Sequence, residues 1–429
     1  MILRLAYSLL LYLALPLIFC RQLWRSRQDS GHRRRWSERL GFVNKVSANN
    51  DGNNSPRIIH FHLVSVGETL AALPLVNRWM AKYPADHVHV TCMTLTGSKE
   101  IQKRLGDKVS HSYLPYDLPC AMSRFYQRIP AAMTIIMETE LWPNLLNQAK
   151  RHNTRTLVMN ARLSERSFYR YNKWQTATEQ LLLPLDKICC QNQATLERFQ
   201  ALGAAESKLD LTGNLKFDMD ISAQILERGD QLRQQLGNDR PVWIAGSTHE
   251  GEDEVLLQAH QQILQQYADA LLILVPRHPE RFEQVAKLIA NQGLSFERRS
   301  SADVSANAQV LLGDTMGELL LMYRTADFAF VGGSLIPRGG HNPLEAVALA
   351  CPVLSGKQVF NFTEVYQMLD DADGMLWATS AREISTAIEQ LISDSNYAGK
   401  MAQAANEVLQ RHQGACLRTI EAIEAMLPE

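Results

Sequence analysis

Several features that would point to common protein classes are scarce or missing in this chain of 429 residues. Its seven cysteines form no Cys-x-x-Cys pair, and the adjacent Cys189 and Cys190 suit neither a metal chelate nor an easy disulfide. An odd number of cysteines fits a reducing compartment, so we expect buried, unreactive thiols. Glycine (23 residues) and proline (16 residues) are not in excess, which excludes collagen-like and low-complexity architectures.

Nucleotide-binding and metal-binding signatures are also missing. No Gly-x-x-x-x-Gly-Lys-Ser/Thr segment occurs, which argues against a P-loop ATPase, and no Gly-x-Gly-x-x-Gly follows an early strand, which weakens a dinucleotide redox function. There is no His-Glu-x-x-His, and the histidines and cysteines lack chelate spacing, so we expect neither a metal ion nor another cofactor. The run Glu252, Asp253 and Glu254 is interpreted as the solvated, acidic start of a helix.

Charge is distributed unevenly along the chain. The formal net charge is only −1, which argues against a nucleic-acid partner. Residues 21–45, which we call the basic collar, nevertheless carry eight Arg and Lys against Asp29 and Glu38. The Asn-rich stretch 46–56 that follows reads as a polar linker, so 21–56 is expected to connect two differently built parts of the protein.

An uncharged run of 16 residues, Leu5–Cys20, precedes the basic collar. As a helix it would be about 24 Å long, against a hydrocarbon core of about 30 Å, so it is marginal for spanning and well suited to shallow insertion. It lacks a small-x-small cleavage site, which disfavours a signal peptide. Residues 1–20 are therefore predicted to be a membrane anchor, with the Arg-rich flank and the remaining chain on the cytoplasmic face. The alternative is a buried N-terminal helix followed by a solvated charge run.

The remaining chain contains two successive series of short apolar runs that alternate with helical patterns. This pattern predicts an α/β protein with parallel sheets covered by helices on both faces. The strands expected in the first half are Ile58–Val64, His87–Met93, Met133–Met137, Arg155–Asn160 and Lys187–Cys190, with helices at Glu68–Lys82, Glu140–Lys150 and Ala194–Leu202. Those of the second half are Val242–Ala245, Leu271–Val275, Gln309–Leu312, Phe328–Val331 and Pro352–Leu354.

The two halves predict two doubly wound, Rossmann-like domains that face a central cleft. In such sheets ligands bind beyond the carboxyl ends of the strands. The expected divisions are a first domain at 57–213, an interdomain linker at 214–240 that contains a polar helix, a second domain at 241–400, and a C-terminal helix at 401–429 that packs back on the first domain.

Carboxylates follow two strands of the first half. Glu68 begins a helix, whose positive end should favour the charged carboxylate and keep it ionised at neutral pH, ready to accept a proton. Glu138 directly follows a strand, and Glu140 is interpreted as a first-turn helix residue. Lys216, in a Gly/Asn turn between the halves, could reach a phosphate or a carboxylate. Each of these residues also has a purely structural interpretation, as a helix cap or a solvated side chain.

The strand ends of the second half favour a nucleotide-phosphate site. Small residues at 245–251 expose backbone N–H groups, and Arg277 suits bidentate contact with a phosphate. Gly317 follows another strand, as do the glycines before Asn342, which is expected to cap a helix that begins at Pro343. In its first turn, Glu345 could accept two hydrogen bonds from a ribose diol. A purely structural role remains the alternative at each position.

The segments around these residues resemble the family of 3-deoxy-D-manno-octulosonic acid (Kdo) transferases. The resemblance covers nearly the whole chain and rests on matching segments at 65–69, 137–144, 160–164, 213–218, 247–252, 275–281, 313–318 and 339–345. It implies a GT-B fold and a metal-independent, inverting transfer of Kdo from CMP-Kdo to the lipid A precursor, lipid IVA, in lipopolysaccharide core synthesis. Inner-membrane lipids are the further expected partner.

The resemblance also assigns roles to residues. Glu68 corresponds to the catalytic base, and Glu138 and Lys216 to groups that steady the transition state. The implied CMP site consists of Pro276, Arg277, Met316, Gly317, Glu318, Asn342, Pro343, Leu344 and Glu345. Two alternatives stay open: a UDP-sugar 2-epimerase on a related fold, which would act without an acceptor, and a membrane-docked nucleotide-binding protein without turnover.

Overall fold

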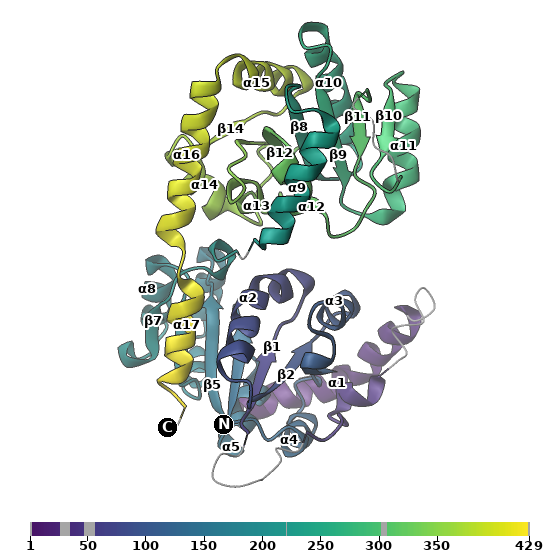
Figure 1. Cartoon of the computed structure of the whole chain (residues 1–429). Coiled ribbons are helices and arrows are strands. Elements are labelled where there is room, and N and C mark those ends of the chain that lie inside the picture. Colours follow the sequence, from purple (N-terminus) through teal and green to yellow (C-terminus); the bar gives the residue numbers. More distant parts are fainter. Residues whose placement is uncertain (1, 26–34, 47–55, 220, 302–306, 428–429) are drawn as a thin grey trace. The chain divides into compact units, whose positions relative to one another are not determined.

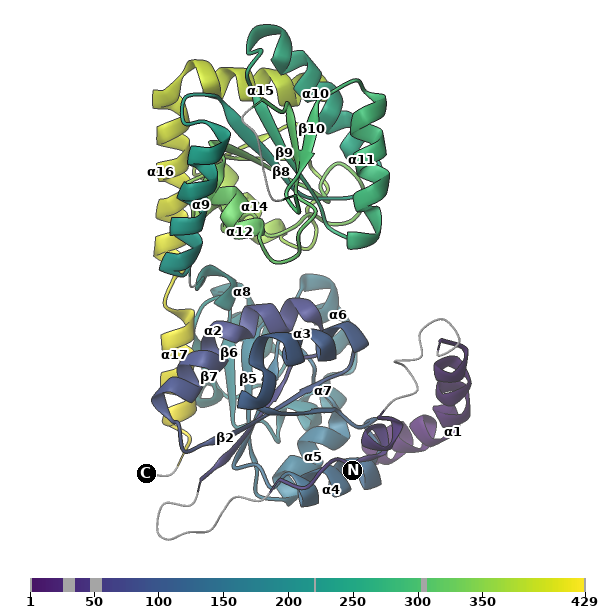
Figure 2. The same cartoon turned by 45° about the vertical axis from the view of Figure 1, so that its right-hand side comes forward.

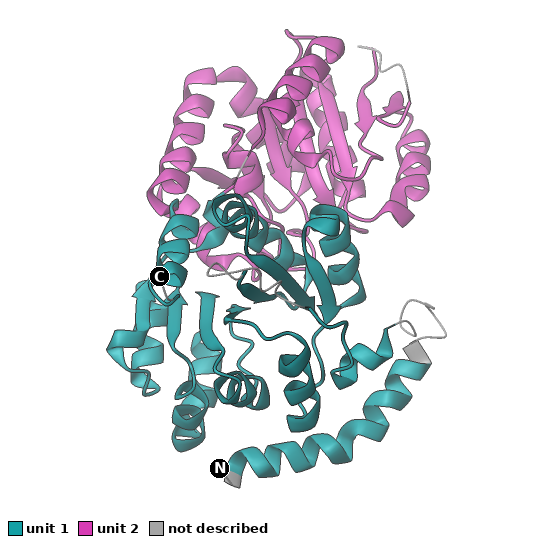
Figure 3. Ribbon diagram, turned by 60° about the horizontal axis from the view of Figure 1, so that its bottom comes forward, with its two compact units in different colours: residues 1–218, 413–429 teal, residues 219–412 magenta. Residues whose placement is uncertain are grey.

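The computed structural model describes residues 2–25, 35–46, 56–219, 221–301 and 307–427. The chain forms two compact units (Figure 3). Unit 1 contains residues 1–218 and 413–429, and unit 2 contains residues 219–412. Each unit holds one sheet of seven parallel strands, so the predicted architecture of two doubly wound α/β domains is confirmed.

The sheet of unit 1 has the strand order β3-β2-β1-β4-β5-β6-β7. Its strands are β1 (Ile58–His62), β2 (His87–Cys92), β3 (Ser110–Tyr113), β4 (Met133–Met137), β5 (Arg155–Ala161), β6 (Lys187–Cys190) and β7 (Leu209–Leu211). The chain winds outward from β1 through β2 to β3 and then returns to β4 on the other side of β1. The strand order therefore reverses between β1 and β4, which is where such sheets bind ligands.

Two helical layers cover this sheet because successive strand residues point to opposite faces. Ile135 belongs to the core under α2, α3 and α17, whereas Ile136 belongs to the core under α4 and α5. Figure 2 shows α2 and α3 on one side of the sheet and α4 and α5 on the other. The helices of unit 1 are α1 (Ile2–Arg25), α2 (Val66–Lys82), α3 (Leu95–Leu105), α4 (Pro119–Arg128), α5 (Pro143–Arg151), α6 (Glu165–Asn172), α7 (Gln175–Leu182), α8 (Gln193–Ala201) and α17 (Ala415–Glu424), with short 3₁₀ turns η2 (Trp36–Leu40), η3 (Gly106–Lys108), η4 (Glu206–Lys208) and η5 (Leu215–Phe217).

The sheet of unit 2 repeats this winding with the order β10-β11-β9-β8-β12-β13-β14 (Figure 1). Its strands are β8 (Val242–Thr248), β9 (Leu271–Pro276), β10 (Phe296–Arg298), β11 (Val310–Leu312), β12 (Phe328–Val331), β13 (Val353–Ser355) and β14 (Met375–Trp377). The reversal lies between β8 and β12. The helices are α9 (Ala223–Leu236), α10 (Asp253–Gln266), α11 (Phe282–Asn291), α12 (Leu319–Thr325), α13 (Leu344–Val347), α14 (Thr363–Asp371), α15 (Ala381–Ser393) and α16 (Ser395–His412), with the 3₁₀ turn η6 (Pro279–Arg281).

Two segments differ from the predicted divisions. The expected linker 214–240 contains α9, which is part of unit 2, because Asp230 pairs with Arg324 at 2.8 Å and Arg233 with Asp327 at 3.1 Å. The expected C-terminal helix at 401–429 is two helices, since Gly414, at φ 92°, separates α16 of unit 2 from α17 of unit 1.

Asp218 holds the start of α17 in unit 1. Its carboxylate accepts hydrogen bonds from the backbone N–H groups of Gly414, at 2.6 Å, and Cys416. A carboxylate at this position satisfies N–H groups that have no partner within the helix.

Candidate functional site

Glu68 and Glu138 lie at the strand-order reversal of unit 1. Glu68 is in the first turn of α2, which follows β1, and Glu138 is the first residue after β4. Since β1 and β4 are parallel neighbours, their carboxyl ends meet at the same edge of the sheet. Glu138 and Glu140 lie close enough to Glu68 for their negative charges to raise its pKa.

The start of α2 fixes the Glu68 side chain. Ser65 caps the helix by accepting a hydrogen bond from the Glu68 N–H at 3.5 Å. In return, Glu68 Oε2 accepts from the Val64 N–H at 2.8 Å, and Glu68 Oε1 accepts from the Ser65 hydroxyl at 3.3 Å. A serine three residues before a glutamate is typical of a capping box, but here the glutamate accepts from the N–H of Val64, one residue before the cap, and from the hydroxyl of the cap residue Ser65. These hydrogen bonds orient the carboxylate while leaving acceptor capacity on both oxygens.

Glu68 is less readily ionised at neutral pH than the sequence led us to expect. Burial raises its pKa to about 7, and the Val64 N–H only partly opposes this effect, while Glu138 and Glu140 add to it. The expectation considered the helix dipole and left out desolvation, which is the larger effect here. A carboxyl group with a pKa near 7 is well matched to accept a proton at neutral pH.

Glu138 is brought together with Lys216. The Lys216 Nζ lies 3.9 Å from Glu138 Oε1, and both side chains are largely covered, at 19% and 28% exposure. Lys216 sits on η5, which is held by Asn160, whose Oδ1 accepts a hydrogen bond from the Leu215 N–H at 3.0 Å. Glu138 itself has a positive φ of 58°, an uncommon conformation for a residue other than glycine.

Glu140 does not belong to a helix, contrary to the prediction. Helix α5 begins at Pro143, which occupies its first position because proline lacks the N–H that a first-turn residue leaves unpaired. Glu140 lies in the preceding turn, where its Oε2 accepts a hydrogen bond from the Trp142 indole at 2.8 Å.

In unit 2, Glu252 joins the loops that follow β8 and β12. Its two oxygens accept hydrogen bonds from the backbone N–H groups of His249, Gly333, Ser334 and Leu335, at 2.7 to 3.0 Å. Glu252 and Asp253 are both fully buried, so the interpretation of 252–254 as a solvated face is wrong for these two residues. Only Glu254 is exposed. Sequence reasoning missed Glu252 because its partners come from a distant segment.

Three histidines gather beside these loops, and we call His249, His278 and His341 the histidine cluster. The rings of His249 and His341 are stacked, with centroids 5.2 Å apart and Nε2 atoms 2.9 Å apart. His278 meets His249 edge-on at 5.3 Å. Burial lowers the pKa of His249 to about 4 and that of His341 to about 3.

Nearby cations depress the pKa values of these two histidines further. Arg277 acts on both rings, and Arg338 acts on His249. The Arg277 guanidinium forms no hydrogen bond or ion pair with the residues that the structure describes. The partly buried Arg277, together with the imidazoles of His249 and His341, makes this an environment that favours an anion. The sequence pointed to Arg277, but not to His341 or Arg338 as its companions.

The other predicted CMP residues also lie at carboxyl ends of strands in unit 2. Pro276 ends β9, and Met316 and Gly317 follow β11. Gly317 has a φ of 91° and open space around its Cα, and the Met316 side chain is 51% exposed. Glu318 is engaged by Thr315, whose hydroxyl donates to it at 2.8 Å, and by Arg228 and Arg299.

Asn342 and Pro343 precede α13, which is a single helical turn at Leu344–Val347. The prediction that Asn342 caps a helix beginning at Pro343 is wrong in its positions, because Pro343 is itself the cap residue. Asn342 Oδ1 still accepts a hydrogen bond from the Leu344 N–H at 3.2 Å. Leu344 is buried in the core, so only its backbone can contribute to a ligand site. The Glu345 side chain is partly accessible.

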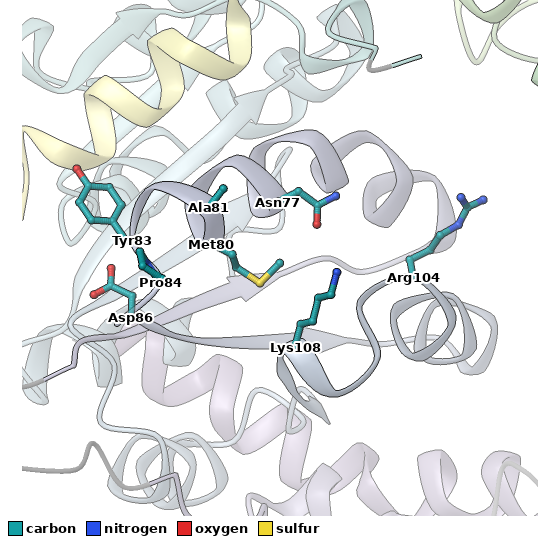
Figure 4. A pocket seen from close by; sticks show the side chains of 8 residues that line it. All are labelled: Asn77, Met80, Ala81, Tyr83, Pro84, Asp86, Arg104 and Lys108. Atoms are coloured by element: carbon teal, nitrogen blue, oxygen red, sulfur yellow. The ribbon is translucent and has the colours of Figure 1, made fainter. Parts of the chain in front are cut away.

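A hollow also lies away from these strand ends. A cavity of about 610 Å³ lies beside the C-terminal end of α2, where Tyr83, Asp86, Arg104 and Lys108 are among its lining residues (Figure 4). Glu68 is at the opposite end of the same helix. The cavity is therefore separate from the strand ends that carry the candidate site.

The seven cysteines differ in how far they are buried. Five cysteines are buried, but Cys20 and Cys120 are exposed, so the expectation of buried thiols is wrong for these two. Within the described ranges, no group of three or more His, Cys, Asp or Glu side chains is arranged to hold a metal ion.

Comparisons with known proteins agree with this division of the chain. Residues 34–219 match the family described as 3-Deoxy-D-manno-octulosonic-acid transferase (kdotransferase), and residues 239–408 match glycosyl transferases group 1. A 3-deoxy-D-manno-octulosonic acid transferase of Haemophilus influenzae is 41% identical over 426 residues, which cover 99% of both chains. One from Bordetella pertussis is 34% identical and covers 85% of this chain and 86% of its own length.

A solved structure shares the fold at much lower identity. The UDP-GlcNAc 2-epimerase from Neisseria meningitidis, solved with bound UDP-GlcNAc, aligns with a TM-score of 0.58 at 11% identity, covering 86% of this chain and 100% of its own. Likeness at this level extends to the fold alone and says nothing about the reaction.

Proposed function

This chain belongs to the 3-deoxy-D-manno-octulosonic acid (Kdo) transferase family and is a glycosyltransferase, and from that premise we propose that it transfers Kdo from CMP-Kdo to lipid IVA. The observation that supports this assignment most directly is Glu68, a positioned carboxyl group with a pKa of about 7 at the strand-order reversal of unit 1. A transfer to a sugar hydroxyl needs one such proton acceptor.

The reaction that we propose is a single displacement. Glu68 takes the proton of the acceptor hydroxyl, whose oxygen forms a bond to the anomeric carbon of Kdo. The bond between that carbon and the phosphate oxygen breaks, and CMP leaves with the electron pair. Attack from the face opposite the leaving group inverts the configuration. The Val64 and Ser65 hydrogen bonds support this role, because they hold the carboxylate in one orientation.

Glu138 and Lys216 are proposed to stabilise the transition state. The anomeric carbon gains positive charge as the bond to phosphate breaks, while the departing phosphate gains negative charge. A carboxylate and an ammonium 3.9 Å apart can complement both changes if the reacting bond lies beside them. Their low exposure supports this role, since electrostatic interactions strengthen as water is excluded.

Unit 2 is proposed to bind the donor. Arg277 provides positive charge, and the neutral rings of His249 and His341 in the histidine cluster provide N–H donors for phosphate, so the negative charge on departing CMP can be compensated without a metal ion. Gly317 allows a ligand to approach the backbone closely, because no side chain occupies the space beside it. Glu345 is proposed to accept hydrogen bonds from the ribose.

Membrane attachment is proposed to bring the enzyme to its lipid acceptor. Residues 3–23 of α1 form a segment long and apolar enough to cross a membrane, with a mean hydropathy of 1.9. The basic collar carries a formal charge of +6, which attracts anionic headgroups. We place the protein at the cytoplasmic face of the inner membrane on these grounds.

One assay tests the proposed reaction. Purified protein is incubated with CMP-Kdo and lipid IVA, and the product mass is measured for the wild type, Glu68→Gln and the control Glu165→Gln, an exposed residue of the same unit. We expect Kdo-modified lipid and free CMP from the wild type and the control, and none from Glu68→Gln with CMP binding retained. Conversion of a sugar nucleotide without acceptor would indicate an epimerase, and binding without turnover would indicate a sensor. Full activity of Glu68→Gln would remove Glu68 as the base.

A further inference from the structure

Helix α1 has two distinct faces along its whole length. Large apolar side chains are exposed on one face, namely those of Leu5, Leu9, Leu13 and Leu17, which recur every four residues, and of Leu3 and Leu10, with exposures between 47% and 74%. The side chains that contact the rest of unit 1, or line a hollow against it, lie on the opposite face, at positions 4, 7, 8, 11, 15, 18 and 22. This spacing matches one side of an α-helix. Tyr12 and Phe19, which also contact the rest of unit 1, lie at the border between the two faces.

The docked face begins with polar contacts. Arg4 donates to Asn147 Oδ1 at 2.6 Å, and the buried Ser8 accepts from Asn144 Nδ2 at 3.0 Å. Tyr7 is hydrogen-bonded to Asp117, whose carboxylate also accepts from the Asn144 N–H at 2.9 Å. Hydrogen bonds of this kind are geometrically demanding, so they specify one position of α1 against α5.

The contacts continue to the C-terminal end of the helix. Gln22 donates to the Tyr116 hydroxyl at 3.1 Å, and the Phe19 ring meets Trp36 at 5.9 Å. Between the two ends, an apolar hollow of about 220 Å³ is lined by Leu11, Leu15 and Ile18 of α1 together with residues of unit 1. Docking from position 4 to position 22 covers about 27 Å at ~1.5 Å per residue.

The surface beside the docked helix cannot enter hydrocarbon. Arg151 of α5 lies close enough to Arg4 to lower the pKa of Arg4, and Arg124 of α4 contacts Cys120, the partner of Tyr12. Charged side chains are strongly disfavoured at the bilayer centre. A transmembrane α1 would have to carry this surface into the bilayer, or to leave it and give up the contacts of Arg4, Tyr7 and Ser8.

We propose that α1 does not cross the membrane but lies in the plane of one leaflet, docked on unit 1, with its leucine face among the lipid acyl chains. The lipid surface that fits is anionic, because the basic collar directly follows α1 in the chain and Arg21 is exposed at its beginning. This inference rests on the membrane attachment proposed above and not on the transfer reaction.

A depth measurement tests this orientation in the full-length protein. An environment-sensitive fluorophore is attached to single cysteines at Leu5, Leu13 and Leu17, in a background with Cys20→Ser and Cys120→Ser. The labelled proteins bind vesicles of phosphatidylethanolamine and phosphatidylglycerol that carry quenchers at either a shallow or a deep acyl position. We expect the same ratio of shallow to deep quenching at all three positions. The matched control, a label at Leu15 on the docked face, should be shielded from both quenchers.

Other outcomes would overturn the proposal. Deepest quenching at Leu13, with shallower quenching at Leu5, is what a transmembrane helix gives, and no quenching at any position would mean that the leucine face does not enter lipid. A second measurement does not depend on labels: a Ser8→Cys/Asn144→Cys pair should form a disulfide in the vesicle-bound protein without releasing it from the membrane. Loss of membrane binding on disulfide formation would contradict the in-plane arrangement. None of these readouts requires Kdo transfer.

Discussion

Glu138 and Lys216 come from separate segments of unit 1 and meet with 3.9 Å between Oε1 and Nζ. Glu138 is placed by the end of β4, and Lys216 by a short turn that Asn160 holds through the Leu215 N–H. This pair is partly accessible and lies beside a carboxylate with a raised pKa, as reacting groups often do.

We predict that Lys216→Met lowers kcat for Kdo transfer by about 10²- to 10³-fold, as loss of one group that stabilises transition-state charge typically does. The KM for CMP-Kdo should change little, because the donor's nucleotide is proposed to bind in unit 2. Steady-state kinetics measure both values. Lys187→Met is the matched control, since Lys187 pairs with Asp210 at 3.0 Å in the same unit. A kcat for Lys216→Met equal to that of the control would contradict the assigned role.

The second prediction concerns the pH dependence of transfer. A base must be deprotonated to act, and the pKa of Glu68 is about 7, so kcat/KM should fall as the pH drops below about 7. Glu140 raises this pKa, and Glu140→Gln should therefore move the midpoint of the profile to lower pH. The control Glu165→Gln should leave it in place. A profile whose midpoint is unaffected by Glu140→Gln would indicate that another group controls the rate.

Glu68 should also affect stability in a defined direction. Its pKa is raised from 4.5 to about 7 by folding, so between these values the folded protein binds the proton more tightly than the unfolded chain does. The free energy of unfolding therefore decreases as the pH rises through this range. Glu68→Gln, which keeps an oxygen acceptor for the Val64 N–H, should lose less stability over the same range. Urea unfolding at both ends of the range measures this, and parallel losses in the two proteins would contradict the raised pKa.

Much of the fold follows from apolar runs that the sequence displays directly. Strands β4, β6 and β12 were predicted with the bounds that the structure has, because each is a short, mainly apolar run whose residues are almost all buried. Strands β3, β7, β10 and β14 were missed. They are the outermost strands of the two sheets, and each is a short segment of three or four residues that does not stand out in the sequence.

The candidate site was predictable to the extent that it depends on strand ends. Glu68 and Arg277 could be found because each follows an apolar strand. His249 and His341 could not be paired, since their contact depends on two loops that Glu252 ties together through four backbone N–H groups. The raised pKa of Glu68 could not be predicted from the sequence either, because it depends on how deeply the folded chain buries this side chain.

Arg277 is expected to contribute to donor affinity. We predict that Arg277→Met weakens CMP binding by about 10- to 100-fold, the effect of losing a charge-assisted contact with phosphate. Calorimetric titration of CMP into the full-length protein measures the affinity, and Arg382→Met, a change at an exposed arginine of the same unit, is the control. If Arg277→Met bound CMP as tightly as Arg382→Met, the phosphate would have to be placed elsewhere.

Glu252 is expected to support the donor site through the backbone alone. Glutamine has the same size as glutamate, but one of its two oxygens is replaced by an NH₂ group. At this fully buried position, that NH₂ group would face the backbone N–H of Gly333 or Ser334, and both would be donors. An unsatisfied buried polar group costs about 1 to 3 kcal/mol, so Glu252→Gln should lower the free energy of unfolding by at least that amount. Since Gly333 packs against the His341 ring, CMP binding should weaken as well. The exposed Glu254→Gln should change neither value, and an equally small effect of Glu252→Gln would mean that the two loops hold their positions without this carboxylate.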